Sequence, residues 1–456
     1  MLALPSNWRK SMAEQTYRCI GVMTGNSLDA VDVVLTEFQG SRINDLCGLT
    51  VDIPVEIGNR FRQLKFMLSQ NNCDIAAIAA KPENHFSELH DSYIKLVAET
   101  INRLLEQNHI AKEKVDLIGF HGQTCGHCPP SIARSRDPSQ IYTLQIGSGQ
   151  MLADLTGIPV AFDFRSDDLM NLGEGAPLAP VHNQHIANDL KSKEIFPVAF
   201  CNGGNTGNIA VISRDKITGR EVVMGWDTGP FNHFIDLLMR EFKNQPCDLD
   251  GETGKQGKIN YRLLRQLFEK AAQTHNQDNF ITMLPPKSSD PAWYRTIPEL
   301  LDENIPFADR VRTVEFFSAY IFVYNLAFIP ENYDFPKYFL VFGGGWRNPV
   351  VYADFKNLLA GKMEVLPEHQ EQFNRIFTPQ PRVEWSDFYG YNGKFMEARI
   401  FADMAKCKLT NEPFSYPETT GCLKPTIGGI IAKPGGKNKQ RWSRAAPGWY
   451  KEKAPK

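Results

Sequence analysis

The stretch from Cys19 to Phe38, CIGVMTGNSLDAVDVVLTEF, decides the fold. An apolar strand stops at a short polar tip and resumes as a second strand rich in β-branched residues, a pattern that predicts a β-hairpin. The tip offers backbone N–H groups and hydroxyls for an anion, and carboxylates for a metal. We interpret it as a phosphate-binding turn, with an ordinary tight turn as the alternative. Its residues are Thr24, Gly25, Asn26, Ser27, Leu28 and Asp29.

A second hairpin of the same design is predicted at residues 196–213, FPVAFCNGGNTGNIAVIS. Its tip contains Gly204, and Asn208 lies on the returning strand. Two hairpins of one design suggest that the chain consists of two related halves.

A third glycine cluster follows the predicted strand 338–342, YFLVF. Its glycines lead through Asn348 into an amphipathic segment that reaches Leu359. The order of strand, glycines and helix favours a close approach of backbone to a ligand, with the helix N-terminus adding partial positive charge. The cluster consists of Gly343, Gly344 and Gly345.

Composition indicates a globular protein with a large core, since 42% of the 456 residues are hydrophobic. The 50 basic and 52 acidic residues nearly balance, which gives no electrostatic reason to expect a nucleic acid partner. The apolar segment 316–329 is too short to span a bilayer and predicts a buried helix, so no membrane contact is expected. The first sixteen residues lack the apolar core of a secretory signal, and nine scattered cysteines fit free thiols, so a cytoplasmic location is expected.

Strands and helices alternate along the chain, which predicts an α/β fold. Residues 84–107 and 259–272 carry apolar side chains at helical spacing. We expect two lobes that flank a cleft. The expected segments are a leader at 1–16, lobe I at 17–164 with 419–432 returning to it, lobe II at 165–418, and a basic disordered tail at 433–456.

The sequence WDTGP, residues 226–230, is the best candidate for chemistry. A strand is expected to end at Met224 and a helix to begin near Asn232, which would place Asp227 at the rim of the cleft. Its carboxylate could accept a proton during phosphoryl transfer, or it could only cap the following helix.

Two other polar clusters are candidates for ligand binding. The strand 115–119 delivers His121 and Gln123 at its C-terminal end, where ligands often bind parallel sheets. The histidines and cysteines of residues 121–128 could suggest zinc, but no second ligand pair follows, so buried thiols are favoured. Arg165 lies among several aspartates and could belong to an ion-pair network or to a sugar-binding rim.

Most of the chain resembles the 1,6-anhydro-N-acetylmuramic acid kinase family, including the related levoglucosan kinases, within the actin, hexokinase and heat-shock ATPase superfamily. The matching segments occur in the family's order. They are GVMTGNSLDAVD, GFHGQTCGH, TLQIGSGQMLADLTGI, DFRSDDL, GAPL, WDTGPFN, DLDGETGKQGKIN, FGGGWRN, FMEARIFA and TTGCLKPTIGG.

The resemblance implies a two-lobed actin/hexokinase-like ATPase fold and an ATP-dependent, Mg²⁺-dependent kinase. Such an enzyme opens the 1,6-anhydro ring hydrolytically while it phosphorylates the freed 6-hydroxyl. By the same resemblance Asp227 activates water, and Asp29 and Glu397 act on the metal, Glu397 through water. Dimers are common in the family, so a homodimer is an expectation.

The remaining roles implied by the resemblance are binding roles. The tip residues 24–29, Gly204, Asn208, Gly343 to Gly345 and Asn348 would contact the nucleotide. The residues implied to face the sugar are His121, Gln123, Arg165, Glu174 and Gly175.

Several positions depart from the family's pattern. Asn26 stands where the family has Thr, Glu174 where it has Gln, and Phe231 where it has Gly. Asn205 lies where a bare glycine would approach phosphate, and residues 285–294, PPKSSDPAWY, lack the family's Arg and Glu. Three readings therefore remain: an active anhydrosugar kinase, a weakened relative that binds sugar or nucleotide as a sensor or partner, and a kinase of a free sugar.

Overall fold

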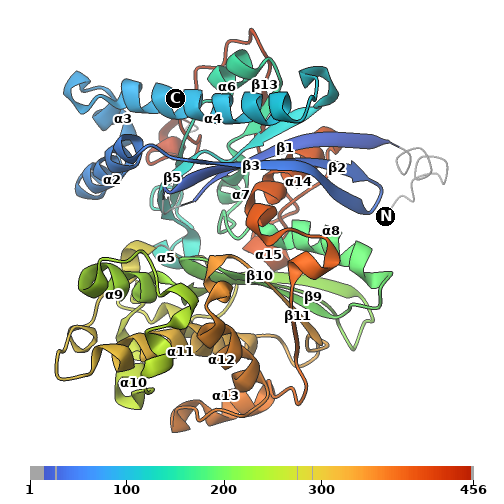
Figure 1. The fold of residues 1–456 in the computed structure, drawn as a ribbon. Coiled ribbons are helices and arrows are strands. Elements are labelled where there is room, and N and C mark those ends of the chain that lie inside the picture. The colour runs from blue at the N-terminus through green and yellow to red at the C-terminus, as the bar shows by residue number, and fades with distance from the viewer. Residues whose placement is uncertain (1–14, 26–27, 275, 290, 453–456) are drawn as a thin grey trace. The chain divides into compact units, whose positions relative to one another are not determined.

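The computed structural model describes residues 15–25, 28–274, 276–289 and 291–452 (Figure 1). It contains two compact units: unit 1 is Met1–Asp189 with Phe395–Lys456, and unit 2 is Leu190–Lys394. The predicted lobe boundaries at 164/165 and 418/419 are therefore wrong, because the segments that follow 164 and precede 419 pack on the first sheet.

Unit 1 is built on a six-stranded sheet with the order β13-β7-β4-β1-β2-β3. β1 and β2 are antiparallel, with Thr24 opposite Val31, so the first predicted hairpin is confirmed. β4 and β7 then continue the sheet in parallel with β1. The strands are β1 Thr16–Thr24, β2 Ala30–Gln39, β3 Arg42–Asp52, β4 Leu117–Phe120, β7 Val160–Phe162 and β13 Ile430–Ala432, and a separate pair is β5 Gln123–Cys128 with β6 Tyr142–Ile146.

Helices cover both faces of this sheet (Figure 1). Ile20 and Val22 of β1 pack with α4 and α2 in one apolar core, whereas Cys19 packs with α14 in another. The predicted helix at 84–107 is confirmed as α4. The helices are α2 Val55–Gln70, α3 Ile75–Ala79, α4 Phe86–Gln107, α5 Pro130–Ala133, α6 Gly149–Thr156, α7 Phe164–Met170, α8 Ala179–Lys191, α14 Met396–Thr410 and α15 Pro417–Thr420.

Two glycines allow α14 to lie directly on the sheet. Gly21 of β1 and Gly119 of β4 are paired neighbours in the sheet. A Cβ on Gly21 would lie 1.8 Å from the carbonyl oxygen of Ala398, and one on Gly119 would lie 1.9 Å from that of Phe401. Any side chain at either position would push the helix away.

Unit 2 repeats the design of unit 1 with the order β10-β9-β8-β11-β12. β8, β9 and β10 form an antiparallel meander, and β11 and β12 continue from β8 in parallel. The second hairpin and the predicted strand at 338–342 are confirmed, and so is the prediction of two related halves. The strands are β8 Val198–Gly203, β9 Thr206–Arg214, β10 Glu221–Pro230, β11 Tyr338–Phe342 and β12 Arg382–Trp385.

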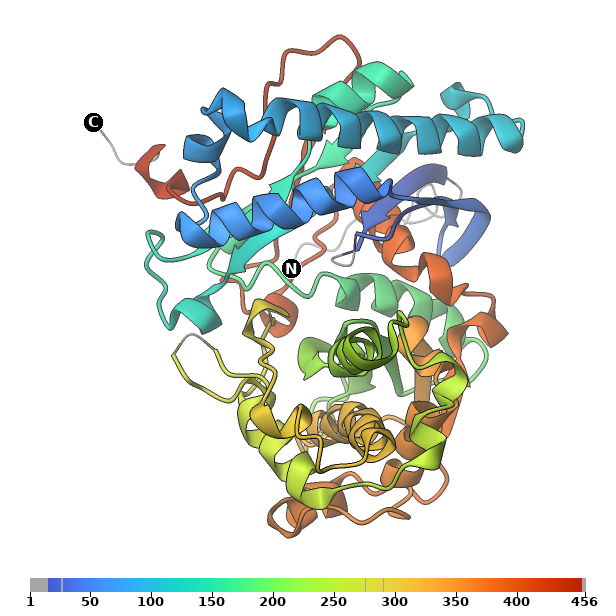
Figure 2. The ribbon, with the colours of Figure 1, turned by 60° about the vertical axis from the view of Figure 1, so that its left-hand side comes forward.

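The core of unit 2 is organised by α11, whose residues 313–326 are all buried. Figure 2 shows α11 in gold, close to end-on, among the other helices of the unit. This confirms the predicted buried helix; among the described residues, no helix is long and apolar enough to cross a membrane. The helices are α9 His233–Lys243, α10 Tyr261–Lys270, α11 Phe307–Leu326, α12 Pro349–Leu359 and α13 Gln370–Arg375.

The C-terminal segment is ordered through residue 452, so the predicted disordered tail is wrong for its described part. Trp442 bridges to Ile146 of β6 and stacks edge-on against Phe86 of α4, with ring centroids 5.8 Å apart. The Trp449 indole N–H donates to the Ile141 carbonyl at 3.0 Å. Composition suggested disorder because the segment is basic, but its aromatic side chains and its arginines have partners in unit 1.

Candidate functional site

Asp227 lies inside β10, where the register with β9 shifts between Asp227 and Gly229. The strand was predicted to end at Met224, but it continues through this bulge to Pro230. The alternative role of Asp227 as a helix cap is wrong, since Asn232 occupies the N-cap position of α9. Bulges re-aim a side chain out of the regular pleat, and here the bulge occurs at the candidate base.

Asp227 is 9% exposed, and its carboxylate is held by residues of the loop that follows α10. The Ser289 N–H donates to Oδ2 at 2.8 Å, and the hydroxyls of Ser288 and Ser289 each donate at 3.3 Å. Ser289 Oγ is also 2.8 Å from the Tyr294 hydroxyl, which is 2.8 Å from Thr206 Oγ1. The segment 285–294, whose sequence differs from the family's pattern, therefore supplies a hydrogen-bond network to the candidate base.

Sequence reasoning did not single out these serines or Tyr294 as neighbours of Asp227. The signal in the sequence was the polar pair Ser288-Ser289. The segment 285–294, which contains this pair, was considered only for its missing Arg and Glu. Distance in the chain concealed the contact, since Ser289 lies 62 residues from Asp227.

Asp227 belongs to a polar row across three strands of unit 2. Asn208 of β9 lies opposite Asp227 on one side and opposite Asn202 of β8 on the other. Directly opposite residues in a sheet point to the same face. The row therefore places the Asn208 amide next to the carboxylate and the Asn202 amide one strand further on. The predicted nucleotide contact of Asn208 stays a prediction.

The third glycine cluster packs against the tip of the second hairpin, so the structure brings these two predicted elements together. Gly343 has φ +94°, and a Cβ there would lie 2.6 Å from Asn202 Oδ1. The Gly204 carbonyl accepts the N–H of Asn232 at 3.1 Å. Gly344 faces open space, since a Cβ there would meet no atom within 4 Å, whereas one on Gly345 would lie 2.4 Å from Asn232 Oδ1.

Asn348 has a structural task that the sequence did not reveal. Its Oδ1 caps α12 by accepting the N–H groups of Val350 at 2.9 Å and Val351 at 3.4 Å. Its amide N–H donates to Glu315 at 2.6 Å. The predicted nucleotide contact of Asn348 therefore stays a prediction.

Phe231, which stands in place of a family glycine, points into the core. It is 1% exposed and packs against Trp346 and Phe322, with ring centroids 4.7 and 5.7 Å apart. A Cβ on Gly203 or on Gly345 would lie 2.7 or 2.6 Å from this ring. The ring is thus accommodated by neighbouring glycines.

In unit 1, the first hairpin tip is described only in part, because Asn26 and Ser27 lie outside the described residues. The Thr24 hydroxyl is 2.8 Å from the Tyr93 hydroxyl and Thr24 is 2% exposed. Gly25 accepts the N–H of Leu28 at 3.2 Å, which closes the turn.

The remaining tip residues differ in exposure. Leu28 has φ 61°, and its side chain is buried in the core of unit 1, so only its backbone could contact phosphate. Asp29 is exposed at the end of the turn, and Glu397 is exposed in the first turn of α14. These two exposed carboxylates are oxygen donors of the kind that Mg²⁺ prefers.

Three of the predicted sugar-facing residues contact one another in unit 1. The Arg165 guanidinium donates to His121 Nε2 at 3.1 Å and to the Gly175 carbonyl at 2.7 Å. Burial, together with the Arg165 charge, lowers the pKa of His121 well below its usual value, so the imidazole is neutral. His121 Nδ1 is buried with no hydrogen-bond partner among the described residues. His121 also lines a small pocket with Gln145 and Asp163.

Glu174 and Gln123 are buried nearby in unit 1. The Glu174 carboxyl accepts the N–H of Ser131 at 3.1 Å and its hydroxyl at 2.5 Å. Burial raises the pKa of Glu174 to about 7. Gln123 donates to the Thr124 carbonyl at 3.3 Å.

The aspartates around Arg165 pair mainly with another arginine. Arg444 of the C-terminal segment contacts Asp163 at 2.6 Å and Asp167 at 2.7 Å. These carboxylates are therefore used to fasten the C-terminal segment, which leaves Arg165 for His121 and Gly175.

The chain is similar to known proteins over most of its length. Residues 17–434 match the family described as anhydro-N-acetylmuramic acid kinase. The chain is 30% identical over 423 residues to the anhydro-N-acetylmuramic acid kinase of Methylorubrum extorquens, with 91% of this chain and 99% of that protein covered. The corresponding protein of Rhodopseudomonas palustris is 31% identical over 417 residues, with 91% and 99% covered.

Among solved structures, a ROK hexokinase from Thermus thermophilus matches with a TM-score of 0.34 and 14% identity, over 87% of this chain and 100% of that chain. At that level of similarity the assignment depends on the sequence matches alone. Because those matches run through nearly the whole chain, the protein belongs to the anhydro-N-acetylmuramic acid kinase family.

Proposed function

We propose that the protein is an ATP-dependent anhydrosugar kinase that opens the 1,6-anhydro ring with water and transfers phosphate to the freed 6-hydroxyl. The observation that carries the proposal is the placement of Asp227. Its carboxylate lies at a β-bulge, in a row with two amides, and accepts hydrogen bonds from Ser288 and Ser289. A base held in this way is oriented before substrate binds, which is what general-base catalysis requires.

In the proposed reaction, Asp227 takes a proton from water as the water oxygen attacks the anomeric carbon. The bond from that carbon to the bridging oxygen breaks, and the bridging oxygen receives the phosphoryl group. ATP supplies that group, and Mg²⁺ neutralises phosphate charge. Asp29 and Glu397 are the residues proposed to act on the metal, and Gly204, Asn208 and Gly343 to Gly345 to contact the nucleotide.

The proposed sugar contacts are those of unit 1. The neutral imidazole of His121 and the guanidinium cation of Arg165 together present hydrogen-bonding groups to the sugar. With a pKa of about 7, Glu174 is partly protonated near neutral pH and can then donate a hydrogen bond, as a glutamine amide can. The family departure at this position therefore preserves a donor.

The direct test is turnover. The protein is incubated with ATP, Mg²⁺ and either 1,6-anhydro-N-acetylmuramic acid or levoglucosan, and ADP and sugar 6-phosphate are measured. Formation of both products is expected. Turnover of free N-acetylmuramic acid or glucose, but of neither anhydrosugar, would contradict ring opening; nucleotide binding without turnover would favour a sensor or partner.

A substitution tests the role of Asp227 as the general base. Asp227→Asn keeps the shape of the side chain but cannot take a proton, so kcat is expected to fall at least about 100-fold. Nucleotide affinity should not change. The matched control is Asp302→Asn, on the surface of unit 2, where the carboxylate accepts the backbone N–H of Asn304 at 2.9 Å and its side-chain amide at 2.8 Å. Undiminished turnover in Asp227→Asn would remove this residue from the mechanism.

A further inference from the structure

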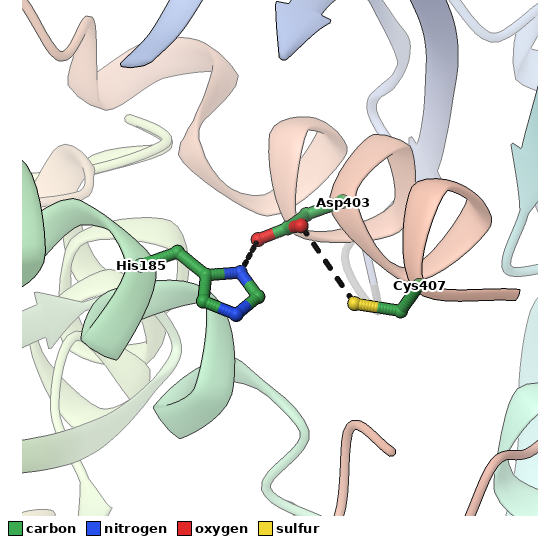
Figure 3. A group of neighbouring side chains, drawn as sticks. All are labelled: His185, Asp403 and Cys407. Atoms are coloured by element: carbon green, nitrogen blue, oxygen red, sulfur yellow. Dashed lines mark hydrogen bonds and ion pairs between the residues drawn. The ribbon is translucent and has the colours of Figure 1, made fainter. Parts of the chain in front are cut away.

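Two helices of unit 1 bring together a histidine, an aspartate and a cysteine that the proposed reaction does not use. His185 lies on α8, and Asp403 and Cys407 lie one turn apart on α14 (Figure 3). Their imidazole, carboxylate and thiol ligand atoms all lie within 4.8 Å of one another. Among the residues that the structure describes, this is the group of three whose spacing suits a metal ion.

The distances are close to those of a tetrahedral site. His185 Nδ1 is 2.7 Å from Asp403 Oδ2, and Cys407 Sγ is 3.9 Å from Asp403 Oδ1. The usual bond lengths of zinc to nitrogen, oxygen and sulfur give ligand separations of about 3.4 to 3.6 Å. Small rotamer adjustments would bring both distances into that range.

A second histidine positions the carboxylate. His182, one turn before His185 on α8, donates from Nδ1 to Asp403 Oδ2 at 2.7 Å and is 2% exposed. Metal-binding carboxylates and imidazoles are typically held by such an outer hydrogen bond. His182 thus fixes the carboxylate from the buried side.

Charge and access also fit a divalent ion. Asp403 and Cys407 are 2% and 1% exposed, and one carboxylate with one thiolate neutralises a charge of +2 inside the protein. The nearby ion pair of Lys406 with Glu412 adds no net charge. The His185 side chain is 29% exposed, so the cluster opens to solvent on one side. A water could complete the coordination there.

We propose that His185, Asp403 and Cys407 bind a divalent transition metal, with zinc as the best match, and that His182 positions Asp403. Mixed nitrogen, oxygen and sulfur donors favour zinc over Mg²⁺ or Ca²⁺, which take oxygen ligands. Binding releases the thiol proton of Cys407 to solvent, and His185 binds as the neutral imidazole whose proton is on Nε2, so that Nδ1 is free to coordinate. The metal would fasten α8 to α14, whose ligands lie 218 residues apart in the chain. Its ligands differ from Asp29 and Glu397, the residues proposed to act on Mg²⁺.

The test is spectroscopic and does not depend on turnover. The full-length protein is stripped with a chelator and titrated with Co²⁺, which gives intense visible bands in tetrahedral sites and a charge-transfer band with thiolate. One Co²⁺ per chain with both features is expected, and Zn²⁺ should displace it. Absence of stoichiometric binding, or octahedral spectra without a thiolate band, would overturn the proposal.

Variants assign the ligands. Cys407→Ser should abolish the charge-transfer band, and His185→Gln should weaken Co²⁺ binding strongly. His182→Gln should weaken it about 10- to 100-fold while the band persists, as expected of a positioning residue. The matched controls are Cys247→Ser, an exposed thiol of unit 2, and His85→Gln, an exposed imidazole of unit 1. Both should bind as the parent protein does.

Thermal unfolding provides a second measurement, which can be made on the parent protein even if a variant folds poorly. Zn²⁺ should raise the melting temperature of the parent protein, because a ligand that binds only the folded state stabilises it. A thiolate band that persists in Cys407→Ser, or equal zinc stabilisation of that variant and the parent, would show adventitious binding and overturn the assignment.

Discussion

Glu174 changes charge near neutral pH, because burial raises its pKa to about 7 from the ordinary 4.5. The folded protein keeps this proton where the unfolded chain has already released it. Stability should therefore decrease as pH rises from about 4.5 to 7, since the buried carboxylate then ionises at a cost. This behaviour belongs to a single residue and can be tested by a single substitution.

Glu174→Gln should stabilise the protein at pH 8, by an amount on the order of 2 to 3 kcal/mol, and much less at pH 5. Glutamine keeps the acceptor for the Ser131 N–H and never ionises. Urea unfolding at the two pH values measures the difference. Glu88→Gln, an exposed residue of α4, is the control and should have little effect at either pH. A Glu174→Gln variant that is no more stable than the parent at pH 8 would contradict the raised pKa of the buried carboxyl group.

Candidate polar residues could be chosen from the sequence, whereas their surroundings could not. Asp227 and His121 were singled out by their position after strands, and Arg165 by the aspartates around it. The structure gives each of them polar partners. The surroundings depended on distant segments. The partner of Asp163 is Arg444, 281 residues later, and no local pattern could reveal that contact.

At the scale of elements, α14 lies on the sheet of unit 1 only because Gly21 and Gly119 have no side chains. The hairpin prediction treated Gly21 as a strand residue and did not foresee the helix above it. Strand Gly often marks a close backbone approach, which was the available signal.

Gly21→Ala should therefore destabilise unit 1 by about 3 kcal/mol or more, since the new methyl group would overlap the Ala398 carbonyl. Gly58→Ala in α2 is the matched control, because its nearest contact would be an ordinary 3.5 Å. Alanine there should be neutral or stabilise the helix by up to about 1 kcal/mol. Both are measured by chemical denaturation. Equal stability of the two variants would contradict the observed packing of α14.

The hairpins and most helices were predictable because their patterns are local. The bulge at Asp227 was not, because the WDTGP sequence also fits a turn, and only the pairing with β9 shows that the strand continues. The ordered C-terminal segment was missed for a similar reason. Its basic composition predicts disorder, whereas its contacts with Asp163 and Phe86 depend on tertiary structure.

At the scale of the whole molecule, the two units share one sheet design, an antiparallel meander continued by parallel strands. Repetition of the hairpin in the sequence was sufficient to predict this. The boundaries were not predicted, because the chain leaves unit 1 within α8 and returns just before α14, where the sequence carries no linker signal.

The central claim is that water, activated by Asp227, opens the anhydro ring while the bridging oxygen accepts phosphate. Turnover in ¹⁸O-labelled water tests this most directly, with the product analysed by mass spectrometry and by ¹³C NMR at the anomeric carbon. We expect one ¹⁸O on the anomeric carbon and none in the phosphate or in its bridge to C6. Label in the phosphoryl group, or an unlabelled anomeric oxygen under conditions where exchange is excluded, would contradict the account.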